Sequence, residues 1–156
     1  YYHSLEWTEL GKNHHLRPLH KSHIYPIKEP LTCLIYTASD HIEQMETLIQ
    51  SLPKIQFKIA ARVMVSDRLK QLLVYPNVTV YAGINYLVEL DQELIETSQV
   101  LLDINHGEKT EEVLDRFSER GKLILAFENT KYREVGQITY KVEQVQEMIE
   151  KLREIS

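Results

Sequence analysis

Leu101–Leu102–Asp103–Ile104–Asn105–His106–Gly107 is the stretch that decides the fold of this chain. An apolar run ends here in polar residues and a glycine, and Thr110–Glu111–Glu112 then open an amphipathic helix. Such a run is typical of a buried parallel strand, and open α/β sheets bind ligands at the carboxyl ends of their strands. Because a helix start presents free N–H groups and a partial positive charge, this turn favours an anion such as a diphosphate.

Apolar runs and amphipathic segments alternate through most of the chain. After each run, apolar residues return at helical spacing. Strands are expected over residues 32–37, 55–63, 78–81, 100–104, 123–127 and 137–142. This alternation predicts right-handed crossovers and a parallel sheet. The predicted fold class is Rossmann-like α/β over residues 31–156, with a sheet of about six strands and helices on both faces.

Local signals predict where several helices begin and end. Asp40 followed by Glu43 resembles a capping box, so the first helix is expected to start there and to end before Pro53. Ser66 is expected to introduce a short helix, and Gly121 to follow the end of a later one.

Residues 1–30 break this rhythm and are predicted to form a linker or arm that includes the end of a preceding domain. They hold five of the seven histidines and end in Tyr25–Pro26–Ile27–Lys28–Glu29–Pro30. Prolines with mixed charge favour an extended chain. Because the spacing of these histidines fits no common zinc pattern, no metal site is expected.

Composition argues against several functions. The 156 residues carry a net charge of −5 without a concentrated basic patch, which argues against a general nucleic-acid or anionic-membrane binder. Cys33 is the single cysteine, and no apolar run is long enough for a membrane span, so a cytoplasmic location is expected. The G-x-G-x-x-G, P-loop and G-x-S-x-G patterns are missing. A receiver-like or dinucleotide-binding domain, which would lack its motifs here, is therefore kept only as a third interpretation after the two roles given below.

Polar residues follow most of the predicted strands and should meet at one edge of the sheet, because the carboxyl ends of parallel strands share that edge. The predicted site is a hydrogen-bonding rim for a polar ligand. Its candidates are Thr37, Ser39, Asp40, Arg62, residues 83–85, Asp103, Asn105, His106, Gly107, Glu128, Asn129 and Thr130. Polar loops also follow strands in α/β proteins generally, so solvated loops are an equally weighted alternative.

The turn Gly107–Glu108–Lys109–Thr110 is a candidate phosphate site. Its backbone N–H groups would bind the anion, Lys109 would add charge and Thr110 a hydroxyl. The alternative is a normally capped helix with an acidic first turn. His106 is a candidate ligand-contacting or acid–base residue, with a hydrogen-bonded structural histidine as the alternative.

Five segments of the chain together resemble a known family. They are Ile35–Tyr36–Thr37–Ala38–Ser39–Asp40–His41–Ile42–Glu43, Phe57–Lys58–Ile59–Ala60–Ala61, Tyr75–Pro76–Asn77–Val78, Leu102–Asp103–Ile104–Asn105–His106–Gly107 and Leu125–Ala126–Phe127–Glu128–Asn129–Thr130. In this order they resemble the carboxy-terminal half of GT-B glycosyltransferases from the accessory secretion system of Gram-positive bacteria. Within that family they resemble the stabilising companion subunit of the two-subunit enzyme that adds N-acetylglucosamine to serine-rich adhesins.

The resemblance implies two Rossmann-like domains, of which this chain would be the second and would bind a UDP-sugar donor as substrate, with no cofactor or metal. The diphosphate would lie at Gly107–Thr110, and Asn105 and His106 would contact sugar or phosphate. The remaining implied donor-site residues are Thr37 and Ser39 on the cleft floor, Arg62 and Glu128 near base or ribose, and Asp103 with Glu111 as the nearest match to the family's pair of donor-site glutamates.

Two roles follow from the resemblance. In the first, the chain is the donor-binding domain of an enzyme of protein O-glycosylation and is inactive alone, since the acceptor half would lie in the other domain. In the second, it belongs to a non-catalytic subunit that binds a partner glycosyltransferase and the serine-rich adhesin. Any peripheral membrane association would come through a part of the protein outside this chain.

Overall fold

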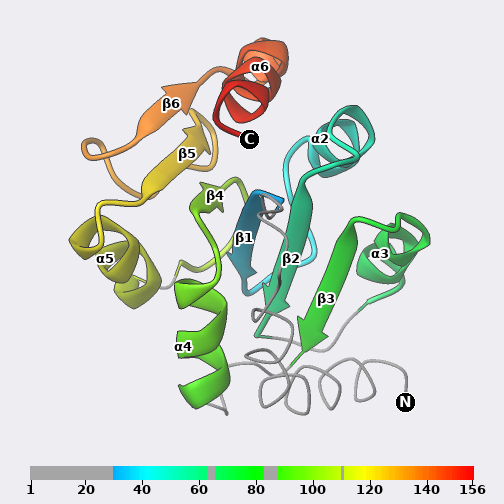
Figure 1. Cartoon of the computed structure of the whole chain (residues 1–156), viewed down its shortest axis with the longest axis horizontal. Coiled ribbons are helices and arrows are strands. Elements are labelled where there is room, and N and C mark those ends of the chain that lie inside the picture. Colours follow the sequence, from blue (N-terminus) through cyan, green and yellow to red (C-terminus); the bar gives the residue numbers. More distant parts are fainter. Residues whose placement is uncertain (1–29, 63–65, 83–87, 110) are drawn as a thin grey trace, which may run out of the picture.

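The computed structural model describes residues 30–62, 66–82, 88–109 and 111–156, which form a single six-stranded sheet with helices on both faces (Figure 1). In chain order the elements are β1 (Thr32–Thr37), α2 (Met45–Ser51), β2 (Gln56–Ala61), α3 (Asp67–Lys70), the 3-10 helix η1 (Gln71–Val74), β3 (Val78–Ala82), α4 (Val88–Glu96), β4 (Val100–Asp103), α5 (Glu111–Glu119), β5 (Leu123–Phe127), β6 (Ile138–Tyr140), η3 (Val142–Gln144) and α6 (Val145–Ile155). The predicted fold class is confirmed.

The sheet is parallel throughout, in the order β3-β2-β1-β4-β5-β6. On one side of β1 lies β2 and then β3. On the other side of β1 lie β4, β5 and β6, in that order. The strand order therefore reverses between β1 and β4. This is the topological switch point, where the loops leaving two adjacent strands diverge and open α/β sheets bind their ligands.

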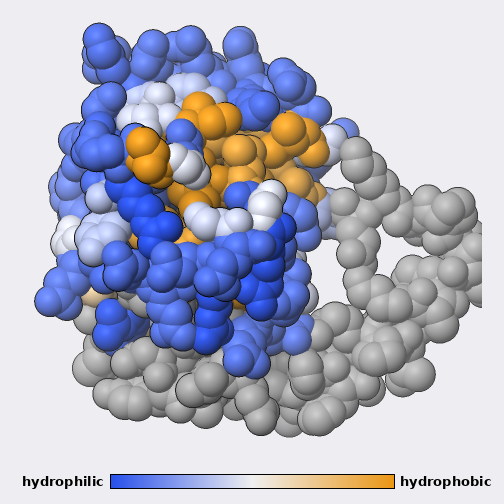
Figure 2. Space-filling model, turned by 90° about the vertical axis from the view of Figure 1, so that its left-hand side faces the viewer, coloured by the Kyte–Doolittle hydropathy of each residue, from blue (hydrophilic) through white to orange (hydrophobic). Residues whose placement is uncertain are grey.

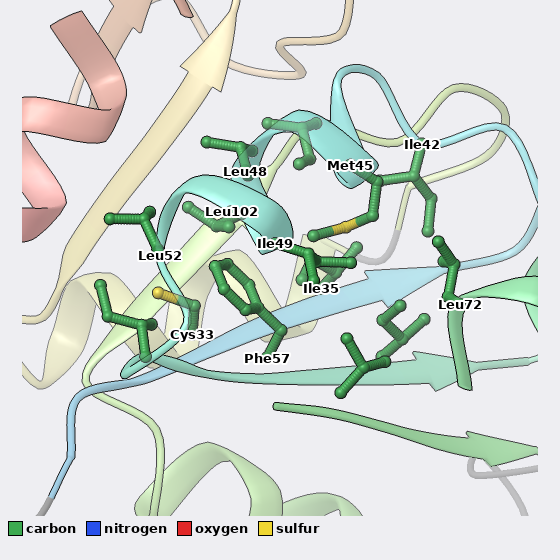
Figure 3. Packing of buried hydrophobic residues seen from close by; sticks show 14 of the residues in the cluster. Cys33, Ile35, Ile42, Met45, Leu48, Ile49, Leu52, Phe57, Leu72 and Leu102 are labelled. Carbon is green, nitrogen blue, oxygen red and sulfur yellow. The ribbon is translucent and has the colours of Figure 1, made fainter. Parts of the chain in front are cut away.

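Two hydrophobic clusters hold the helices to opposite faces of the sheet. One contains Met45, Leu48 and Ile49 of α2 together with residues of α3, η1 and α6, and the other contains residues of α4 and α5. Figure 3 shows part of the first cluster, with Phe57 of β2 pointing toward α2. All six residues of β1 are buried, because helices cover both of its faces. The predicted helices on both faces are thus confirmed.

Helix α2 starts four residues later than the sequence predicts. The expected capping box of Asp40 and Glu43 does not form: α2 begins at Met45, and its N-cap, Gln44, has a left-handed φ of 57° and no capping hydrogen bond from its side chain. The backbone of the preceding residues pairs instead across the switch point, where Ile42 forms an antiparallel bridge with Asn105. This pairing satisfies backbone groups that a longer helix would otherwise have used.

Other boundaries agree with the sequence more closely. The predicted bounds of β1 and β5 are confirmed, whereas β2, β4 and β6 are shorter than predicted and β3 is one residue longer. Ser66 caps α3 by accepting a hydrogen bond from the Leu69 N–H at 3.5 Å, as predicted. Gly121 follows α5 with a φ of 66°, also as predicted. The predicted linker up to residue 29 and the rim residues 83–85 lie outside the described residues.

Figure 2 shows the side of the molecule where α5 and β6 lie in Figure 1; the described residues on this face are mostly hydrophilic and surround an apolar patch. Cys33 is fully buried within the first hydrophobic cluster, and burial raises the pKa of its thiol. Within the described parts of the chain, no helix is both long and apolar enough to cross a membrane.

Candidate functional site

The loops that leave β1 and β4 touch at the switch point. Ser39 Oγ donates a hydrogen bond of 2.5 Å to the carbonyl oxygen of His106. Gly107 lies directly against Ser39: a Cβ at Gly107 would be 3.3 Å from Ser39 Cβ. The φ of Gly107 is +97°, a conformation that residues with a Cβ rarely adopt. The structure therefore brings Ser39, His106 and Gly107 together, as the prediction of a shared rim requires.

Thr37 supports this contact from below. Its side chain is fully buried, its Oγ1 donates to the Ser39 carbonyl at 2.7 Å, and the Ser39 N–H donates back to Oγ1 at 3.0 Å. The two hydrogen bonds fix the turn after β1. Thr37 is thus a positioning residue for Ser39, and the Thr37 hydroxyl is already engaged within the turn.

Lys109 points inward. Its Nζ lies 2.7 Å from Asp103 Oδ1 and also donates to the Asn105 carbonyl oxygen. The side chains of Lys109 and Asp103 are only 10% and 4% exposed. Asp103 Oδ2 in addition accepts the Tyr132 N–H at 2.9 Å. Two of the charged donor-site candidates, Lys109 and Asp103, are therefore paired with each other beneath the turn.

A second polar cluster, which the sequence analysis does not identify, lies on the same rim. His106 Nε2 is 2.9 Å from Glu43 Oε1, and Asn129 Nδ2 donates to the same carboxylate oxygen at 3.0 Å. The rings of His41 and His106 stack with their centroids 4.0 Å apart. The sequence signal was the His-x-Glu spacing of His41 and Glu43, which the expected helix cap obscured.

The electrostatics of this cluster favour an ionised carboxylate. The hydrogen bond from His106 lowers the pKa of Glu43 below its usual value, against a smaller opposing effect of burial, and the hydrogen bond from Asn129 lowers it further. Glu43 is 21% exposed and His106 is 28% exposed. The rim therefore presents a fixed negative charge beside two imidazole rings that solvent can reach.

The remaining predicted site residues are more dispersed. Arg62 follows β2, and its backbone N–H donates to the Thr37 carbonyl at 2.9 Å. Glu128 follows β5, is exposed and lies 3.1 Å from Lys131. Glu111 is exposed in the first turn of α5. Thr110 lies outside the described residues.

Two cavities show where a ligand has room. One of about 10 Å³ under the β4 turn, lined in part by Asp103, Asn105 and Lys109, accommodates no more than about one water molecule. Asn105 is 1% exposed, and its Nδ2 has no hydrogen-bond partner among the described residues. The other cavity, of about 270 Å³, opens between the loop at Asp40 and the helix at Arg68. Of these two cavities, the one beside α2, α3 and η1 has room for a small molecule, and the one under the β4 turn does not.

Comparison with known proteins identifies the family. The family model described as "GftB/GlyA-F C-terminal domain" matches residues 33–156. The chain is 77% identical over 156 residues to the glycosyltransferase GlyA of Streptococcus pneumoniae serotype 4 (strain ATCC BAA-334 / TIGR4), covering 100% of this chain and 22% of GlyA. It is 42% identical over 97 residues to the N-acetylglucosaminyltransferase stabilizing protein GtfB of Streptococcus gordonii, covering 62% of this chain and 21% of that protein.

A solved structure supports the same assignment. A chain of the GtfA/B complex bound to UDP and GlcNAc superposes with a TM-score of 0.72 and 32% identity, over 84% of this chain and 30% of that chain. The chain thus spans about a fifth to a third of the length of these relatives. By sequence and fold, it belongs to the GftB/GlyA-F C-terminal domain family of GT-B glycosyltransferases and their stabilising proteins.

Proposed function

We propose that this chain is the donor-binding domain of a bacterial glycosyltransferase that acts in protein O-glycosylation, and that a UDP-sugar binds at the rim between β1 and β4. The observation that carries the proposal is the contact of Ser39 with His106 and Gly107 at the switch point, on the edge where α/β sheets bind nucleotides. Family membership adds support, since GlyA is named a glycosyltransferase and the GtfA/B complex was solved with UDP and GlcNAc.

The residues divide into ligand-contacting and positioning roles. Ser39, His106 and the backbone of Gly107 are proposed to contact the diphosphate or sugar, because they lie at the rim. Arg62 and Glu128 are proposed to approach the base or ribose. Thr37 and Lys109 are proposed to position the turn, because their polar side-chain atoms already bond within it. Asn105 is proposed to position it through its backbone carbonyl, which accepts a hydrogen bond from Lys109. Thr110 and Glu111 stay proposed donor residues at the start of α5.

The donor needs no metal ion in this scheme. Side chains and helix N–H groups can stabilise a departing diphosphate through preorganised hydrogen bonds. The acidic first turn of α5, with Glu111 and Glu112, limits how closely an anion approaches that helix. The diphosphate is therefore proposed to bind at the Ser39–Gly107 contact rather than at the helix start. We expect this domain alone to bind the donor without transferring the sugar.

A thermal-shift titration with UDP tests the proposal. At a UDP concentration 100 times its Kd, binding adds about 2.7 kcal/mol to the free energy of unfolding. For a domain of this size, that is a rise in Tm of roughly 5–11 °C. The His106→Asn variant should lose most of the rise, whereas His14→Asn, at a residue far from the rim in sequence, should keep it. Absence of any shift at millimolar UDP contradicts the proposal.

The second candidate function is a non-catalytic subunit that stabilises a partner glycosyltransferase and helps it bind a serine-rich adhesin. The similarity to GtfB of S. gordonii, which is named a stabilizing protein, favours it. Its test is co-purification of the intact protein with a second glycosyltransferase, combined with the UDP titration. Stable association without any UDP response would favour this candidate, and transfer of sugar by the single intact protein would exclude it.

A further inference from the structure

His41, Glu43 and His106 form a compact group of metal-ligand types on the rim. One potential ligand atom from each residue lies within 4.8 Å of the other two. We propose that these three side chains bind one divalent transition-metal ion of the zinc class. Metal binding does not require donor binding, although His106 belongs to both proposed sites. The proposal departs from the expectation of no metal site, which rested on the histidine spacing of the first 30 residues and on the family resemblance.

The donor set suits such an ion. Two imidazole nitrogens and one carboxylate oxygen are the protein ligands of many zinc sites that keep a fourth position open. With bonds of about 2.0–2.1 Å, tetrahedral ligand atoms lie about 3.3 Å apart. The His106 Nε2–Glu43 Oε1 pair is already 2.9 Å apart, so only a small opening of this pair and a rotation of exposed His41 are needed. Hard oxygen-seeking ions such as Mg²⁺ and Ca²⁺ are disfavoured by the two imidazoles.

The backbone holds the three residues in place before any ion binds. The Glu43 N–H donates to the Ile104 carbonyl at 2.8 Å, and the His106 N–H donates to the His41 carbonyl at 2.9 Å. Together with the Ile42–Asn105 bridge, these bonds join the two loops at the ligand positions. Because these backbone bonds already order both loops, metal binding would lose little conformational entropy.

The carboxylate also has an outer partner. Asn129 Nδ2 donates to Glu43 Oε1 at 3.0 Å and so orients the carboxylate. Hydrogen bonds of this kind fix metal ligands in position, and losing one weakens metal affinity by about 10–100-fold. His41 is exposed, and the other two side chains are partly exposed. An ion can therefore enter from solvent and retain a coordination position open to water or to a ligand.

Zinc titration of the intact protein against a chromophoric chelator tests the proposal, with Co²⁺ absorption as a second readout of the ligand set. The His41→Asn and His106→Asn variants should each lose one bound Zn²⁺ per chain. Asn129→Ala should keep the ion with about 10-fold weaker affinity. The matched control is the double variant His14→Asn/His15→Asn, which removes two histidines of the N-terminal segment and should leave this ion in place.

The outcomes separate cleanly. If His41→Asn, a change at an exposed side chain, leaves the stoichiometry and the Co²⁺ spectrum unchanged, the proposal is overturned. It is also overturned if only the His14/His15 double variant loses the ion. Thermal unfolding of each variant in chelator shows whether it is folded, and Glu43→Gln, which keeps the shape of the side chain, replaces any variant that is not. The UDP titration is a separate measurement, so either proposal can fail without the other.

Discussion

The buried pair of Lys109 and Asp103 predicts a large loss of stability when one partner is removed. In Lys109→Met the apolar stem is kept, but Asp103 remains 4% exposed with one hydrogen bond left, from the Tyr132 N–H. An uncompensated buried charge of this kind costs about 3–5 kcal/mol of the free energy of unfolding. For a domain of this size, that lowers Tm by roughly 6–20 °C.

A second substitution shows whether the charge is the cause. Asp103→Asn removes the negative charge and keeps an oxygen that accepts the Tyr132 N–H. The Lys109→Met/Asp103→Asn double variant should therefore recover most of the lost stability, because replacing both partners of a buried pair is often nearly neutral. Lys151→Met is the matched control: Lys151 lies 3.9 Å from Glu154 on the surface, and its loss should change stability by less than about 0.5 kcal/mol.

Urea unfolding, followed by circular dichroism, measures the differences in the free energy of unfolding, provided that the dependence of this free energy on urea concentration is the same in all variants. If Lys109→Met is as stable as Lys151→Met, then Lys109 does not neutralise a buried carboxylate. A Lys109 free at the surface would return to the role of phosphate ligand that the sequence suggests. A double variant less stable than Lys109→Met would instead show that the loss came from packing.

Three further predictions concern the rim, the core and the helix α2. Gly107→Ala should lower the free energy of unfolding by about 1–3 kcal/mol, because its φ is positive and its Cβ would be crowded. Gly136→Ala should lower it less, because the φ of Gly136 is also positive but its Cβ position is open. Urea unfolding of the two variants measures the difference. Cys33 should react with a thiol reagent only at the rate of unfolding, because it is fully buried and burial raises its thiol pKa, and fast labelling of the native protein would contradict this. The Tyr75 hydroxyl donates to Glu46 at 2.7 Å, and this hydrogen bond raises the pKa of Tyr75 above 10.0. The bond therefore stabilises the fold below pH 10, and its contribution is lost as the pH rises through the raised pKa. Glu46→Gln should lower the Tyr75 pKa in an NMR titration.

Local patterns in the sequence predicted most of the sheet. The bounds of β1 and β5 followed from short, mainly apolar runs, because strands buried on both faces are rich in apolar side chains. The glycine that follows α5, Gly121, and the serine cap of α3 also followed from residue type. The start of α2 could not be predicted in this way, because the backbone of residues 42–43 pairs with residues 104–105 across the switch point. A local sequence pattern does not indicate a backbone partner some sixty positions away.

The sequence by itself determined the class of the domain, and it predicted the edge of the sheet where we propose that a ligand binds. Apolar runs, helical periodicity and the alternation of strands with helices along the chain are local properties, and the direction of parallel strands then places all their carboxyl ends together. Only the tertiary structure decided which polar residues face solvent there. It turned Lys109 inward onto Asp103 and brought His41 and Glu43 to His106, because side-chain direction depends on charges and backbone partners that come from distant segments.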